Sequence, residues 1–235
     1  MNNTTLQLKI KQRLNKLASN DYDNIEKWQI VEAFNKAQVE WVRRQLRGSN
    51  PFQDGDEESK RRVDDLQVLL KEEELNLVKK DLFFETRFDL PNDYLEYKRV
   101  TAEGVSDCCP DPHLLIVYLS EEANRDVLLR DEHRKPSYDW AETFCTLINN
   151  KVRIYTNNEF EVENAKITYY RQPLNIEIQG TEDPYTTVLS PVDIEPEFKD
   201  DIVELIIDET AAILAGDIES SNQFGRGTQS AERTN

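Results

Sequence analysis

The sequence contains little glycine and histidine, and this scarcity argues against several classes of enzyme. Only 7 of the 235 residues are glycine, and none stands in the Gly-x-Gly-x-x-Gly or Gly-x-x-x-x-Gly-Lys order of a nucleotide-binding loop. With two histidines and no Gly-x-Ser-x-Gly motif, no nucleophile has a candidate base in a recognisable context. We therefore expect a protein that is not an enzyme and has no cofactor.

Cysteine is also scarce, and its spacing does not favour a metal site. The three cysteines, Cys108, Cys109 and Cys145, are an odd number in a chain of this length, so we expect reduced thiols rather than a disulfide framework. Cys108, Cys109 and His113 lie in the segment DCCPDPH, but adjacent cysteines ligate one zinc ion poorly, and a four-ligand site would need distant carboxylates. We interpret this segment as a proline-rich turn and expect no metal.

Long hydrophobic runs are missing as well. The longest uncharged apolar stretch is residues 114–120, far shorter than the ~20 residues that a bilayer-spanning helix needs. The first residues alternate charged with apolar side chains and lack the apolar core of a signal peptide. We expect no membrane partner and synthesis in a reducing cytoplasm.

Positive charge is in short supply overall, but not at the start of the chain. The 29 Lys and Arg residues face 46 Asp and Glu residues, and the resulting net charge of −17 repels nucleic-acid phosphates, which disfavours a conventional DNA-binding module. Residues 1–50 hold nine basic and five acidic side chains, whereas residues 156–221 hold three basic and sixteen acidic ones. These regions attract each other either within one subunit or between neighbouring copies in a head-to-tail ring. Alternatively, the acidic excess is a solvated surface that keeps the protein soluble.

Helical periodicity marks both ends of the chain. Leu6, Ile10 and Leu14 recur at intervals of four and predict a first amphipathic helix, and a second pattern predicts a helix over residues 24–47. We expect these two helices to form an antiparallel hairpin with Trp28 and Trp41 in its core. A third helical pattern runs from residue 59 to about residue 70, and a last helix is predicted over residues 197–220, with apolar residues on one side and acidic residues on the other.

The period changes to two in the middle of the chain. Residues 84–90 alternate apolar with charged side chains and predict a half-buried strand. Asn149 and Asn150 suit a hairpin turn, because asparagine tolerates positive φ. A short helix is predicted within residues 120–129, and the remaining strand-like runs imply an antiparallel sheet; they cover residues 97–102, 114–119, 144–148, 151–155, 162–171 and 174–178.

These patterns predict an α+β protein in which an N-terminal helical hairpin and a C-terminal helix pack together around a central antiparallel β-rich insertion. The predicted regions are residues 1–81, with an acidic loop at 48–60; residues 82–178, rich in strands; residues 179–221, an extended loop at 179–196 followed by the C-terminal helix; and a tail at 222–235. The tail is almost free of apolar residues, so we expect it to be disordered or ordered by a partner.

Three segments resemble head–tail connector proteins of tailed bacteriophages, with the crAss-like group closest. They are residues 28–44, which contain WQIVEAFNKAQ and EWVRR; residues 167–173, ITYYRQP; and residues 197–220, which begin with EFKDDIVEL and end with AGDIES. The resemblance spans nearly the whole chain, and its motifs are structural, with no catalytic residues.

The resemblance implies a structural virion protein that is made in the host cytoplasm and placed at the head–tail interface. Connectors of this kind form a ring, commonly of twelve copies, between the portal protein and a downstream tail or second ring protein. The bore of the ring carries genomic DNA during ejection without sequence-specific binding. By this resemblance, the segment expected to contact the portal consists of Gln223, Phe224, Gly225, Arg226 and Gly227.

The charge pattern suggests which residues serve such a ring. We expect the acidic side chains of the last helix and the arginines of the second helix to lie at the DNA channel or at the subunit interface. These candidates are Arg43, Arg44, Arg47, Asp200, Asp201, Glu204 and Asp208.

Two other functions compete with the ring protein. The first is a non-catalytic cytoplasmic adaptor that forms no ring. The second, more remote, is a metal-dependent nuclease, because Asp93 followed by Glu96 and Lys98 faintly resembles the carboxylate and lysine pattern of such enzymes. Asp93 and Glu96 are too close in the chain to be the two carboxylates, which such enzymes carry on neighbouring strands, and a turn followed by the start of a strand explains the same residues.

Overall fold

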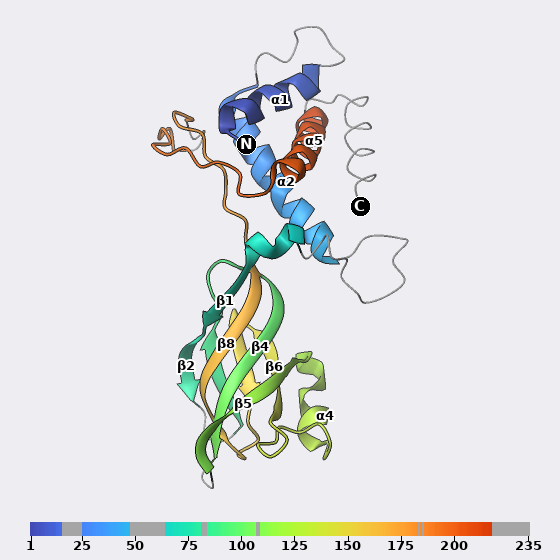
Figure 1. The fold of residues 1–235 in the computed structure, drawn as a ribbon, viewed down its shortest axis with the longest axis vertical. Coiled ribbons are helices and arrows are strands. Elements are labelled where there is room, and N and C mark those ends of the chain that lie inside the picture. Colours follow the sequence, from blue (N-terminus) through green and yellow to red (C-terminus); the bar gives the residue numbers. More distant parts are fainter. Residues whose placement is uncertain are drawn as a thin grey trace. The chain divides into compact units, whose positions relative to one another are not determined.

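A computed structural model describes residues 1–15, 25–47, 64–80, 84–106, 109–182, 184 and 186–217. The chain forms two compact units, Met1–Val68 with Pro173–Asn235, and Leu69–Gln172 (Figure 1). We call them the helical unit and the sheet unit. The first contains most of the helical residues and the second contains a large mixed sheet, which confirms the α+β class.

The helical unit is assembled around its last helix. Both α1 (Asn3–Asn15) and α2 (Lys27–Arg47) pack against α5 (Asp200–Asp217) and make few contacts with each other (Figure 1). A short helical stretch at residues 64–66 leads into η1 (Gln67–Leu69). Residues 16–24 and the predicted loop at 48–60 lie outside the described residues, so the hairpin stays a prediction. The buried apolar side chains of the three helices include Leu6, Ile10, Ile30, Phe34, Val42, Ile202, Val203, Ile206 and Ile207.

The two tryptophans of α2 differ in burial. Trp41 is buried, as predicted, and its ring meets that of Phe198 edge-on at 5.5 Å between centroids. Trp28 is only partly buried, because its indole N–H donates to Glu26 Oε2 at the surface over 2.7 Å. The expectation that both lie in the core is therefore wrong for Trp28.

The chain between the sheet unit and α5 forms a long excursion, residues 173–199. Its described residues hold no helix or strand, as expected for residues 179–196, and its two sides meet at isolated bridges, Glu177 with Ile194 and Glu182 with Leu189. The strand predicted at residues 174–178 is wrong, because Ile176 pairs with a side chain. Asn35 Oδ1 accepts from the Ile176 backbone N–H at 2.8 Å, and its amide nitrogen donates to the Ile176 carbonyl at 3.3 Å.

The sheet unit contains eight strands in the order β1-β8-β4-β5-β6-β7-β3-β2. Their bounds are β1 (Leu70–Glu74), β2 (Asn76–Lys80), β3 (Glu85–Asp89), β4 (Tyr94–Ser106), β5 (Cys109–Leu119), β6 (Glu142–Ile148), β7 (Lys151–Tyr155) and β8 (Glu161–Arg171). The predicted strands at 84–90, 97–102, 114–119, 144–148, 151–155 and 162–171 are confirmed, with β4 and β5 longer than expected.

The sheet closes on itself through one continuous segment. β1 and β2 stand at opposite ends of the strand order, yet only Leu75 separates them in the chain. β1 pairs with β8 and β2 pairs with β3, so the segment 70–80 joins the two edges into a barrel-like sheet. Its core includes Leu75, Phe88, Val100, Leu115, Val117, Cys145, Ile154, Val162, Ile167 and Tyr169.

Two predictions for this unit need correction. The predicted antiparallel sheet is mixed, because β5 and β6 run parallel, joined by η2 (Glu122–Asn124) and α4 (Arg125–Arg130). This crossover contains the short helix expected at residues 120–129. The helical pattern that reached Leu70 instead gives way to a strand there, because the backbone of residues 70–74 pairs with β8. Tertiary pairing overrides local helical periodicity at this point.

The turn between β6 and β7 agrees with the sequence. Asn149 and Asn150 have φ values of 52° and 58°, the left-handed conformation that asparagine tolerates better than most residues. The two-residue connection then lets β6 and β7 pair from Ile148 and Lys151 onward. The predicted hairpin turn is confirmed.

Leu75→Ala tests the closure of the sheet. Leu75 is 8% exposed, and its backbone N–H donates to the Ala165 carbonyl at 2.8 Å. Truncation leaves a cavity where β1 passes into β2, so we expect chemical denaturation to show a loss of about 2–5 kcal/mol in the free energy of unfolding. Leu77→Ala, two residues along at a half-exposed position, is the matched control and should cost less than about 1 kcal/mol. Equal losses for the two variants would contradict a core position for Leu75.

Candidate functional site

Acidic side chains of α5 face basic side chains of α1. Lys9 and Arg13 are four residues apart on α1, and Glu204 and Asp208 have the same spacing on α5, so each pair lies on one helix face. Arg13 Nη2 lies 2.9 Å from Glu204 Oε2, and its Nε donates to Asp208. Lys9 also pairs with Glu204. These partly buried pairs fix the rotation of α5 against α1.

A deeper ion pair joins α5 to α2. Arg44 donates to Glu209, whose side chain is only 8% exposed. Burial raises the pKa of Glu209, and the neighbouring Arg44 cation opposes this rise by stabilising the carboxylate. A charge this buried is tolerated because its partner accompanies it, and removing the partner would leave an uncompensated buried charge.

The first turn of α5 presents acidic groups to solvent. Asp200 is 74% exposed and pairs with the amino group of Met1 at 2.8 Å, and hydrogen bonding to that cation lowers the pKa of Asp200. Asp201 is exposed beside it. Both carboxylates also complement the positive end of the helix dipole.

The structure brings most of the predicted charged residues into pairs within one chain. Glu204, Asp208 and Arg44 are engaged in this way, so the attraction between the basic start and the acidic end of the chain is satisfied internally at these positions. Arg43, Asp200 and Asp201 remain exposed. Sequence reasoning missed Lys9, Arg13 and Glu209, although the matching four-residue spacings on α1 and α5 were a usable signal. Outside the described residues lie the Arg47 side chain and all of Gln223, Phe224, Gly225, Arg226 and Gly227.

The residues considered for zinc do not form a site in the described part of the chain. His113 is exposed and stacks on the Tyr138 ring, 4.7 Å between centroids and 4° from parallel. Cys108 and the side chain of Cys109 lie outside the described residues. Cys145 is a buried free thiol of the core, and burial raises its pKa to about 12, so it stays protonated. Over the described ranges, no group of three or more His, Cys, Asp and Glu residues is placed to hold a metal ion.

Asp93, the candidate carboxylate of a nuclease, is engaged by neighbours from two strands. Tyr169 donates to Asp93 Oδ1 at 2.6 Å, and Lys71 Nζ lies 3.1 Å from Oδ2. Partial burial acts to raise the pKa of Asp93, but the hydrogen bonds from Tyr169 and Lys71 lower it below its usual value. Lys98 is exposed on β4. The Asp93 carboxylate therefore links the turn before β4 to β1 and β8.

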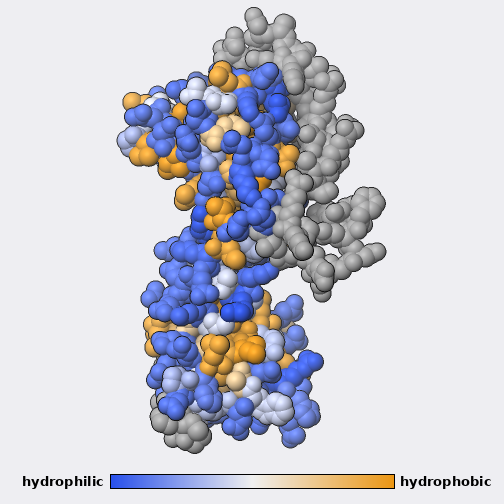
Figure 2. Space-filling view, viewed as in Figure 1, coloured by the Kyte–Doolittle hydropathy of each residue, from blue (hydrophilic) through white to orange (hydrophobic). Residues whose placement is uncertain are grey.

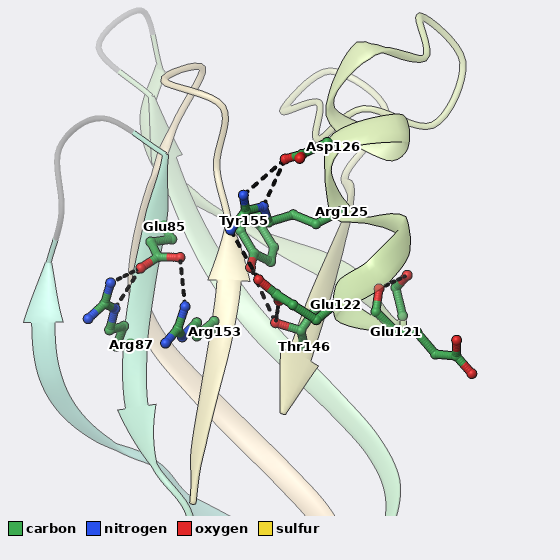
Figure 3. Close-up of polar contacts among 10 residues, drawn as sticks. Glu85, Arg87, Glu121, Glu122, Arg125, Asp126, Thr146, Arg153 and Tyr155 are labelled. Atoms are coloured by element: carbon green, nitrogen blue, oxygen red, sulfur yellow. Dashed lines mark hydrogen bonds and ion pairs between the residues drawn. The ribbon is translucent and has the colours of Figure 1, made fainter. Parts of the chain in front are cut away.

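A second polar cluster fastens the crossover helices to the sheet (Figure 3). Glu122 of η2 accepts hydrogen bonds from Thr146 of β6 at 2.8 Å and from the Tyr155 hydroxyl of β7 at 3.1 Å. Burial raises the pKa of Tyr155, so the phenol remains a neutral donor. On the far side of β7, Glu85 accepts from Arg87 and lies 3.9 Å from Arg153. The hydrogen bonds to Glu122 attach η2 to β6 and β7.

Neither a protein-family model nor a curated protein matches this chain.

In the part of the chain that the structure describes, no helix is long and apolar enough to cross a membrane.

Glu209→Gln tests the buried ion pair through its pH dependence. Because the pKa of Glu209 is raised in the folded state, its contribution to stability is largest below its ordinary value of 4.5 and decreases as the pH rises through the folded-state value. We expect the free energy of unfolding of the wild type, minus that of the variant, to fall over this range. Denaturant titrations at a series of pH values measure it, and Asp201→Asn is the exposed control. A difference that does not change with pH would contradict the raised pKa.

Proposed function

We propose that this chain is a non-enzymatic structural subunit of a ring between the portal and the tail of a tailed bacteriophage. In this proposal about twelve copies assemble beneath the portal protein, contact a downstream tail or second ring protein, and surround the channel through which the genome passes. The protein is made in the host cytoplasm and ends in the virion at the head–tail interface.

The observation that carries the proposal is the packing of the segments that resemble connector proteins. Residues 28–44 belong to α2, and residues 197–217 lead into and form α5. These segments contact each other through Trp41 and Phe198 and through Arg44 and Glu209. The resemblance therefore covers two helical segments that pack together. Its sequence motifs include Trp41, Arg44 and Phe198, which lie at the contact between them.

The finer arrangement of the helical unit belongs to the same proposal. We take α1 and α2 as the two arms of a hairpin that closes on α5 to form a small bundle. The ion pairs from Lys9, Arg13 and Arg44 to α5 support it, because both arms contact the same helix.

The exposed acidic residues support a passive channel. Tight binding of phosphate would oppose the sliding of DNA, whereas repeated negative charge repels the backbone. Asp200 and Asp201 are the channel candidates that remain exposed at the start of α5, and each subunit carries a net charge of −17. Glu204 and Asp208, which pair with α1, and Asp200, which pairs with the Met1 amino group, contribute less free charge than Asp201.

The mass of the protein with and without portal rings tests the proposal. We expect a monomer in isolation and a complex containing about twelve copies when portal rings are added, measured by light scattering after size-exclusion chromatography. Templated assembly is expected because weak contacts between subunits gain effective concentration once they are held on a ring. A chain that stays monomeric and ignores the portal would instead support a non-catalytic adaptor.

Deletion of residues 222–235 tests the portal contact carried over from the family. We expect the truncated chain to keep its circular-dichroism spectrum and its midpoint of thermal unfolding, because the described core ends before this segment. Portal attachment should weaken, and Phe224→Ala in the full chain should reproduce part of that loss, because aromatic residues often anchor interfaces. A truncated chain that unfolds, or that binds the portal as before, would contradict this assignment.

A further inference from the structure

The excursion and α2 border an open cavity in the helical unit. Its volume is about 470 Å³. The buried side chains of Ile176 and Ile178 line it, together with Val188 and Leu189, which are 63% and 60% exposed. Figure 2 shows apolar side chains among hydrophilic ones over this part of the helical unit. We call this cavity the excursion groove.

The wall that α2 contributes combines an aromatic ring with a carboxylate. Trp28 and Glu32 both line the groove, and their spacing of four residues places them next to each other on one face of the helix. Asn35 lies on the same wall and exchanges hydrogen bonds with the Ile176 backbone, so it fastens the excursion to α2. The indole and the carboxylate are therefore held beside the apolar residues of the excursion.

The carboxylates of the groove have no basic partner among the residues that the structure describes. Glu177 lines the groove from the excursion, and its Oε2 accepts a hydrogen bond from the neutral Ser190 hydroxyl at 2.8 Å. In the same described ranges, no lysine or arginine forms an ion pair with Glu32, Glu177 or the exposed Glu182. The paired carboxylates of α5 differ in this respect.

The surroundings of the groove are acidic because of the excursion. Residues 173–198 contain six acidic side chains and no basic one. Lys199 follows them and pairs with Asp64, which leaves the charge of the excursion in place. On α2, two exposed lysines near the groove are balanced by two glutamates: Lys27, Lys36, Glu26 and Glu32. The potential at the groove therefore favours a positively charged occupant.

The open wall favours a side chain of a protein segment over an enclosed small molecule. Pockets for small ligands bury about 70–90% of the ligand surface. Val188 and Leu189 are more than half exposed, so the groove covers only one side of its occupant. A protein segment fits this geometry, because one or two of its side chains enter the groove while its backbone stays outside.

We propose that the excursion groove binds a segment of a partner protein in which an arginine stands next to a bulky apolar residue. The guanidinium stacks on the Trp28 ring and pairs with Glu32 or Glu177, and the apolar side chain packs on Val188 and Leu189. Arginine suits the groove better than lysine, because its planar guanidinium stacks on aromatic rings and binds carboxylates through two parallel hydrogen bonds. The inference goes beyond the proposed function and does not depend on the ring.

Fluorescence polarisation with three labelled peptides tests the chemistry of the occupant. The probe is GSFRLSG; the reference GSFQLSG removes its charge, and the reference GSGRGSG removes its apolar side chains. Each peptide is titrated with the full chain. We expect saturable binding of the probe, with a Kd on the order of 0.1–1 mM, and binding about tenfold weaker for each reference, because both parts of the occupant contribute.

Variants of the full chain locate the binding site. We expect Glu32→Gln to weaken probe binding about tenfold and to abolish the preference for arginine over glutamine, because the partner of the guanidinium is lost. Glu40→Gln, at an exposed position of α2 outside the groove lining, is the matched control. Val188→Ser should weaken binding about threefold, and Val127→Ser, 67% exposed on α4, should leave it unchanged.

Three results would overturn the inference. The first is no saturable binding of the probe, and the second is equal binding of all three peptides. The third is an equal affinity of the Glu32→Gln and Glu40→Gln chains for the probe. A chain that lacks residues 222–235 supplies a further test: unchanged affinity supports an occupant from another protein, whereas tighter binding would overturn it in favour of the chain's own tail. None of these results decides whether the chain assembles on portal rings, which the mass measurement tests separately.

Discussion

The docking of α5 between the two N-terminal helices is the interaction on which the helical unit depends. α1 and α2 make few contacts with each other, so each is held chiefly through α5. The apolar side of α5 supplies the buried surface, and its acidic residues take up the positive charge of Lys9, Arg13 and Arg44. Hydrophobic burial provides most of the free energy, whereas the ion pairs determine which face of α5 meets which helix.

A comparable constraint acts in the sheet unit, where residues 70–80 supply both β1 and β2, the strands at the two ends of the strand order. Because Leu75 alone separates β1 from β2, the sheet has a closed core into which the strands point alternate residues. The outward residues are then set by the same alternation. On β5 this places Leu114, Ile116 and Tyr118 in solvent, which is an energetic cost unless another surface covers them.

Some features of the fold and of the candidate site follow from local sequence patterns, and others depend on long-range packing. Amphipathic periodicity located the three long helices, the alternation of residues 84–90 located β3, and Asn149-Asn150 located the turn after β6. The parallel pairing of β5 with β6 was not predictable, because strand order depends on contacts distant in sequence. The uneven distribution of charge predicts attraction between the two ends of the chain. It does not predict that Arg44 pairs with Glu209, because that pairing depends on how α2 and α5 are rotated against each other.

Composition and short-range spacing are enough to predict the α+β fold class, the excess of acidic residues, the positions of most helices and strands, and the lack of phosphate-loop and catalytic-triad motifs. Long-range packing was needed to show that residues 70–80 join both ends of the sheet, that Glu204, Asp208 and Glu209 are paired within the chain, and that Trp140 is exposed on a hydrogen-bonded turn. Those outcomes depend on long-range packing, which brings together residues that no local pattern relates.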